Sequence, residues 1–90
     1  MYAYELTVSA LPSDKEAAIS IIEEQGVTID ETITTYDMDN ENPRVEIAFY
    51  ARPEQWASAK EDLTRAGIEY DVIHEAQVPR EDVEWLWREE

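Results

Sequence analysis

The sequence contains no cysteine, only two glycines and a single histidine. Without cysteine there are no disulfides, no thiolate metal sites and no cysteine nucleophile. Both glycines stand at the predicted ends of helices, which leaves none for a phosphate-binding loop, and no serine stands in a nucleophile elbow. His74 has no cysteine or second histidine with which to anchor a zinc ion. These absences predict a protein that is not an enzyme and that needs no cofactor.

The chain also lacks any apolar run long enough to span a membrane. Its start, MYAYELTV, lacks the basic and then apolar layout of a signal peptide. We therefore expect a cytoplasmic protein. At 90 residues the chain predicts one domain, near the lower size limit for a core without disulfides or metal.

Positive charge is scarce, because 22 aspartates and glutamates stand against seven lysines and arginines, for a net charge of −15. A field of that sign repels nucleic-acid phosphates and anionic lipids, and it speeds encounter with basic surfaces. The charge therefore argues against direct nucleic-acid or membrane binding and favours a basic protein as partner. Two explanations of the acidity carry equal weight: solubility or adaptation to salt, and a negatively charged binding surface.

Strand-like and helical patterns follow one another along the chain. Strands are predicted at residues 2–10, 27–36, 44–51 and 68–76, and helices within residues 11–26 and 52–67, each ending at a glycine. This order predicts an α+β fold, the ferredoxin-like βαββαβ sandwich, with four antiparallel strands in spatial order 4-1-3-2 and both helices on one face. Residues 1–76 are expected to form this domain, and residues 77–90 a short helical tail packed on it.

Local signals refine these segments. Ser13 and Glu16 have the spacing of a capping box at the start of the first helix. Glu31 falls on the apolar face of the second strand, which predicts a bulge or an early strand end. That strand is expected at a sheet edge, where it could pair with a copy of itself although Asp30, Glu31 and Asp37 oppose this. The chain is therefore expected to be a monomer or a homodimer.

One face of such a sheet is left free by the helices, and period-two counting assigns its residues. They are Ala3, Glu5, Thr7, Ser9, Arg44, Glu46, Ala48, Tyr50, Glu69, Asp71, Ile73 and Glu75. RNA-binding modules of this topology carry aromatic and basic residues there. Because carboxylates dominate here, the pattern excludes that use.

The tail, EDVEWLWREE, places large apolar side chains among acids. On a helix, Val83, Leu86 and Trp87 share one side and are predicted to cover the apolar part of the free face, near Ala48, Tyr50 and Ile73. Trp85 is predicted to point the opposite way. It has two interpretations: an indole lying on neighbouring surface, which is slightly favoured, or an exposed anchor for a basic partner, ringed by Glu81, Glu84 and Glu89.

The segment DMDNENP has acidic residues at the spacing that opens a calcium loop, at Asp37, Asp39 and Glu41. The glycine required at the sixth position is Asn42, and the glutamate required at the twelfth is Ala48. A polar hairpin turn is the favoured interpretation, so no metal site is predicted.

The tail segment VPREDVEWLWRE and the opening MYAYELTV resemble the N-terminal ferredoxin-like domain of the methyltransferase that modifies the stalk-base protein of the large ribosomal subunit. Glu81, Asp82, Trp87 and Arg88 match that pattern, and Val83 stands where a first tryptophan is expected. The resemblance implies a domain that recognises a basic ribosomal protein and has no catalytic residue of its own. The catalytic, cofactor-binding domain that follows in that family is not in this sequence.

Three functions stay open, of which the first is favoured and the third is disfavoured because the sequence lacks the chemistry of such a site. The first is an acidic inhibitor or nucleic-acid mimic that occupies the groove of a nucleic-acid-binding or host-defence protein, as in phage or plasmid inhibitors. The second is recognition of a ribosomal protein, and the third is regulation by a small ligand. For a basic protein partner, the predicted binding residues are Glu46, Glu69, Asp71, Glu75, Glu81, Glu84, Trp85 and Glu89.

Overall fold

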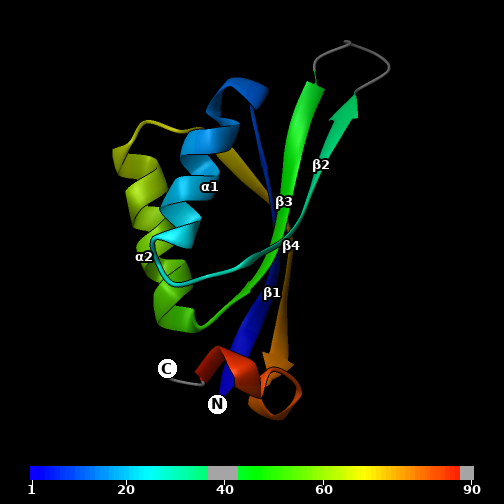
Figure 1. The fold of residues 1–90 in the computed structure, drawn as a ribbon, viewed down its shortest axis with the longest axis vertical. Coiled ribbons are helices and arrows are strands. Elements are labelled where there is room, and N and C mark those ends of the chain that lie inside the picture. The colour runs from blue at the N-terminus through cyan, green and yellow to red at the C-terminus, as the bar shows by residue number, and fades with distance from the viewer. Residues whose placement is uncertain (37–42, 88–90) are drawn as a thin grey trace.

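A computed structural model describes residues 1–36 and 43–87 of the chain. Two layers are visible in Figure 1, a four-stranded sheet and a pair of helices that cover one of its faces. The strands and α-helices are β1 (Tyr2–Ala10), α1 (Lys15–Glu23), β2 (Ile29–Tyr36), β3 (Pro43–Ala51), α2 (Pro53–Arg65) and β4 (Tyr70–Pro79). Three short 3-10 turns accompany them, at Pro12–Asp14, Arg80–Asp82 and Glu84–Trp87.

The sheet has the strand order β2-β3-β1-β4, with every neighbouring pair antiparallel. This is the predicted order, and it confirms the ferredoxin-like fold. The first strand is central, so β1 pairs with β3 on one side and with β4 on the other. The second strand is at an edge, as predicted.

The core lies between the sheet and the helix layer. Leu6 and Val8 of β1 and Leu63 of α2 are completely buried there. Phe49 of β3 meets Trp56 of α2 edge to face, with ring centroids 5.9 Å apart. Phe49 and Trp56 are the two largest of the fully buried side chains, so this contact joins the sheet to α2 at the centre of the core.

Both helices end where the glycines predict. Gly26 and Gly67 have φ angles of 89° and 77°, the left-handed conformation that favours glycine after a helix. The predicted start of the first helix is wrong, however. Residues Pro12–Asp14 form a 3-10 turn, α1 begins at Lys15, and no side chain caps it. Proline lacks a backbone N–H and is therefore favoured in the first turn of a helix. The helical turn thus starts at Pro12, one residue before Ser13, which was expected to cap the helix.

Two bulges change which side chains share a face. One lies between Ile29 and Glu31 of β2, where the sequence predicted it. The other is in β4. The adjacent residues Thr7 and Val8 of β1 pair with His74 and Val72, so one residue of β4 is left without a partner. Beyond this second bulge the alternation of β4 is reversed.

The reversal corrects two predicted positions on the free face. Glu75 pairs with Leu6, a core residue of the helix side, and so does not belong to the open face. His74 takes the open-face position instead, opposite Thr7. Ile73 is the extra residue of the bulge, with 51% of its surface exposed, so the tail does not cover it as expected.

The tail is helical, but it forms two 3-10 turns in place of one helix, and β4 extends to Pro79 before it begins. Val83 is 5% exposed, in keeping with its predicted inward position. Arg80 ties the tail to the chain start, because its backbone N–H donates to the Met1 carbonyl over 3.3 Å. Figure 1 shows the tail beside the start of β1 and the end of β4. No helix within the described residues is long and apolar enough to cross a membrane.

Candidate functional site

The residues predicted to bind a basic partner are divided between the two ends of the sheet. Asp71 pairs with Ser9 near the end of β1, whereas Glu81, Glu84 and Trp85 follow a strand end that pairs with Tyr2. Ser9 and Tyr2 are separated by roughly 23 Å, at about 3.3 Å per strand residue. The two groups therefore do not form one compact site.

Two further predicted residues, Glu46 and Glu69, lie at the Asp71 end of the sheet. Glu46 is half-buried on β3 opposite Ser9 and so lies level with Asp71, whereas Glu75 is on the helix side. Glu69 is exposed just before β4. Glu89 lies outside the described residues, as do Arg88 and the calcium-loop pattern at 37–42.

At the end of β1, Asp71 forms an ion pair with Arg44 over 3.3 Å. The Arg44 guanidinium also donates from Nε to Ser9 Oγ over 2.9 Å and from Nη2 to the Ser9 carbonyl over 3.1 Å. A hollow of about 330 Å³ opens here, lined by Arg44, Ile68, Glu69, Tyr70 and Asp71. Because these bonds engage Arg44 with its neighbours, the guanidinium acts first as a link between β1, β3 and β4.

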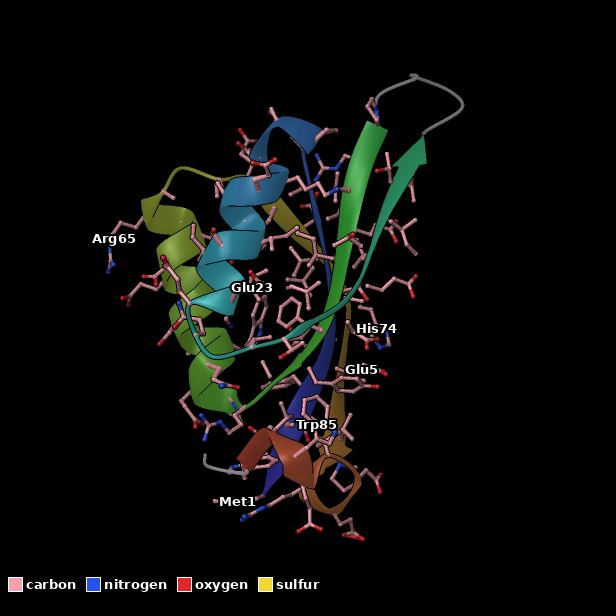
Figure 2. All side chains as sticks on the ribbon, viewed as in Figure 1. Met1, Glu5, Glu23, Arg65, His74 and Trp85 are labelled. Carbon is pink, nitrogen blue, oxygen red and sulfur yellow. The ribbon has the colours of Figure 1, made fainter. Side chains whose placement is uncertain are left out.

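The centre of the open face holds a different cluster, built around Glu5 of β1. Glu5 Oε2 accepts a hydrogen bond from the Tyr50 hydroxyl over 2.8 Å, and Oε1 accepts one from His74 Nε2 over 3.0 Å. In Figure 2 the side chains of Glu5 and His74 point away from the helix layer. Three strands thus supply one hydrogen-bonded group, which we call the Glu5 cluster: Glu5, Tyr50 and His74.

These hydrogen bonds shift the pKa values of Glu5 and Tyr50. The bond from His74, followed by the bond from Tyr50, lowers the pKa of the Glu5 carboxyl below its usual value. The pKa of the Tyr50 hydroxyl is raised, first by its bond to Glu5, then by burial and by the nearby charges of Glu5 and Asp30. At neutral pH the cluster therefore contains an ionised carboxylate beside a protonated phenol.

A hollow of about 260 Å³ opens over the Glu5 cluster. Its lining comes from three strands of the sheet and from the bulge of β2: Glu5, Leu6, Thr7, Asp30, Ala48, Phe49, Tyr50 and His74. The ionisable residues in this lining are Glu5, Asp30, His74 and Tyr50. The lining contains no lysine or arginine. The hollow is therefore negatively charged.

The tail supplies an aromatic neighbour to this hollow. The Trp85 ring meets the Tyr50 ring nearly at a right angle, with centroids 5.9 Å apart, and Trp85 is 48% exposed. The predicted outward direction of Trp85 is thus wrong, since two 3-10 turns rotate side chains differently from an α-helix. The favoured interpretation, an indole lying on neighbouring surface, describes the contact correctly.

Sequence reasoning placed Glu5 and Tyr50 on the open face but did not join them to His74. The bulge in β4 brings His74 there, and the pattern of β4 did not predict a bulge. Within residues 1–36 and 43–87, no three histidine, aspartate or glutamate side chains are placed to hold a metal ion.

No protein-family model and no curated protein matches the sequence. Solved structures share its fold. A putative PII-like signalling protein from Thermus thermophilus matches with a TM-score of 0.69 and 9% identity, over 92% of this chain and 95% of that one. CPII from Thiomonas intermedia K12, bound to ADP, AMP and acetate, matches with a TM-score of 0.67 and 18% identity, over 88% and 90%.

Prephenate dehydratase from Streptococcus mutans also matches, with a TM-score of 0.69 and 18% identity. The match covers 88% of this chain but 45% of that protein, so this chain corresponds to less than half of it. At these identities the likeness establishes the ferredoxin-like fold alone.

Proposed function

We propose that this chain is a regulatory domain that binds a small ligand on the open face of its sheet and performs no catalysis itself. The observation that carries the proposal is the hollow over the Glu5 cluster, to which all four strands contribute. Concave sites with a few convergent polar groups and an aromatic wall are typical of small-molecule binding. The proposal is also supported by the fold, which is shared over nearly the full length with a putative PII-like signalling protein and with CPII bound to ADP and AMP.

The chemistry of the cluster favours binding over catalysis. A histidine paired with a carboxylate activates a hydroxyl or thiol only when that nucleophile is bonded to it. Within the described residues, the His74 side chain is bonded to Glu5 alone, and Arg44 engages the Ser9 hydroxyl. The absence of a hydroxyl bonded to His74 among the described residues favours holding and orienting a ligand over activating a nucleophile.

The test is a titration followed by two-dimensional amide NMR. The panel contains ADP, AMP, bicarbonate, amino acids and amines, added singly to the labelled protein. We expect at least one compound to give saturable shifts concentrated at Glu5, Tyr50, His74 and the Trp85 indole N–H. A panel in which no compound moves these signals, or in which the shifts fall on the helix layer, would contradict the proposal.

A second candidate is docking of the acidic surface on a basic protein. The net charge of −15 and the half-exposed Trp85, flanked by exposed Glu81 and Glu84, favour it. The inhibitor or nucleic-acid mimic and the recognition domain for a ribosomal protein are two forms of this proposal, and the solved structures above lend support to neither.

Salt separates this candidate from the first. Docking on a basic protein predicts capture of a nucleic-acid-binding or ribosomal protein at low salt and its release as salt rises, with Trp85→Ala weakening capture. Capture that salt does not change, or that Trp85→Ala leaves intact, would count against it.

A further inference from the structure

We propose that the ligand of this hollow is a small organic cation, an alkylammonium or guanidinium compound. Its charged group binds between Glu5 and Asp30, and its carbon skeleton lies against Tyr50 and Trp85. This inference rests on the proposed function, because it names the ligand class of the same site.

The carboxylate of Glu5 is held in place and still has capacity to accept. Each carboxylate oxygen can accept two hydrogen bonds, and Tyr50 and His74 supply one to each oxygen. Their bonds fix the orientation of the group in advance, so a ligand does not need to order it. Each oxygen of Glu5 can still accept one more hydrogen bond, and a ligand that carries N–H donors can supply it.

Asp30 places a second negative charge on the same hollow. It lies at the bulge of β2 and lines the hollow, close enough to Tyr50 for its charge to bear on the phenol. Two carboxylates with no lysine or arginine among the lining residues repel an anionic ligand. The net charge of the whole chain acts in the same direction, because it raises the local concentration of cations.

Trp85 does not line the hollow itself, but it contacts the lining residue Tyr50 and offers an aromatic ring beside the hollow to an organic cation. Ammonium and guanidinium groups bind over aromatic faces, best of all over tryptophan. The chain makes this contact twice within itself: Lys60 Nζ lies 5.2 Å from the Trp56 ring centre, and Arg80 Cζ lies 5.0 Å from that of Trp87. Within residues 1–36 and 43–87, no such cation lies over Trp85. A ligand can supply it.

A metal ion fits the hollow less well. Divalent ions require several ligands at short distance, and the described residues hold no group of three suitable side chains. A cation that carries its own hydrogen-bond donors and apolar surface uses both the carboxylates and the aromatic rings.

The experiment compares four-carbon compounds that differ in their end groups: putrescine, 1,4-butanediol and succinate, with Mg²⁺ as a fourth probe. Binding is measured by calorimetry and by NMR of the Tyr50 and Trp85 signals. We expect saturable binding of putrescine and none of the diol or succinate. Asp30→Asn and Glu5→Gln should each weaken putrescine binding by about tenfold, the loss expected for one charge-assisted hydrogen bond.

The matched control is Glu16→Gln, which removes the same charge from α1 on the opposite face of the sheet. It should leave putrescine affinity nearly unchanged, and melting curves should show each variant folded. Equal weakening by all three variants would mean non-specific attraction to the net charge and would overturn the proposal. Mg²⁺ binding with the same NMR shifts would overturn it in favour of a metal.

The outcomes also separate this inference from the proposed function. If succinate, ADP or another anion moves the Tyr50 and Trp85 signals while putrescine does not, the regulatory site stands and the ligand class is wrong. If no compound moves them, both proposals fail.

Discussion

At the scale of the residue, Glu5 joins the sheet to its candidate function. Its carboxylate accepts from Tyr50 and His74, which come from the two strands that flank β1. Hydrogen bonds to the ionised form lower the pKa of a carboxyl group and link its protonation to folding. The same bonds that present Glu5 to a ligand therefore make a pH-dependent contribution to stability.

The sign of that contribution follows from the lowered pKa. A carboxyl with a depressed folded-state pKa stabilises the fold above its unfolded pKa, near 4.5, and this stabilisation is lost as the pH falls through the folded value. We expect Glu5→Gln to be less stable than wild type at pH 7, with a difference that shrinks below about pH 4.5. Urea unfolding of both proteins between about pH 7 and about pH 3 measures it.

The comparison between the two proteins is needed because a change of pH also alters the charge of the rest of the chain. Their protonation reduces the repulsion within a chain of net charge −15 and affects both proteins alike. A difference in unfolding free energy that grows as the pH falls would contradict the assignment of Glu5 as the bonded carboxylate.

At the scale of the element, the strands and helices were predictable because their local signals agree with the fold. Gly26 and Gly67 end the helices, and the misplaced Glu31 correctly indicates a bulge in β2. The bulge in β4 gave no such signal. Val72 and Ile73 are adjacent apolar residues, so either alternation fits the sequence, and only the pairing with β1 places His74 on the open face.

The tail was harder to predict for a related reason. A spacing of about 100° per residue describes an α-helix, and the tail is too short and too strongly fixed by its contacts to adopt one. Arg80 is held by Met1, and the turn from Val83 to Leu86 places Trp85 against Tyr50. Tertiary contacts, which the local pattern does not contain, decided where the indole lies.

The glycine after α2 offers a test at this scale. Gly67 has a φ of 77°, and a Cβ added there meets nothing within 4 Å. Gly67→Ala therefore carries only the cost of the left-handed backbone, about 1–2 kcal/mol of unfolding free energy. Chemical denaturation of the variant measures this loss, which should appear with little change in the dependence on denaturant. An unchanged stability would mean that the helix ends differently.

At the scale of the whole molecule, negative charge is spread over both layers. Exposed carboxylates occur on α1 at Glu16 and Glu23, and on the tail at Glu81 and Glu84, as well as around the open face. The charge predicted from the sequence is thus a property of the entire surface, whereas the hollow is local. The charge and the fold were predictable from the sequence. The hollow was not, because its shape depends on the register of four strands.

Self-repulsion of this surface predicts a stabilising effect of salt. The Debye length falls from about 30 Å at 0.01 M to about 8 Å at 0.15 M ionic strength. We expect Tm to rise by several degrees when sodium chloride is added over this range, because screening relieves repulsion within the folded chain. Thermal melts in buffers of equal pH check it, with sucrose as an uncharged control. A Tm that stays constant or falls as salt is added would show that nearby positive charges already neutralise the carboxylates.

The central position of β1 sets an order of events during synthesis. Residues 2–10 leave the ribosome before the other strands, yet one of their two partner strands, residues 70–79, emerges about sixty residues later. Contacts this distant in sequence slow folding, and an unpaired strand edge is open to aggregation while it waits. The future central strand therefore has no partner until residues 43–51 are made and only one partner until residues 70–79 follow, an interval in which negative charge along the chain opposes association with other chains.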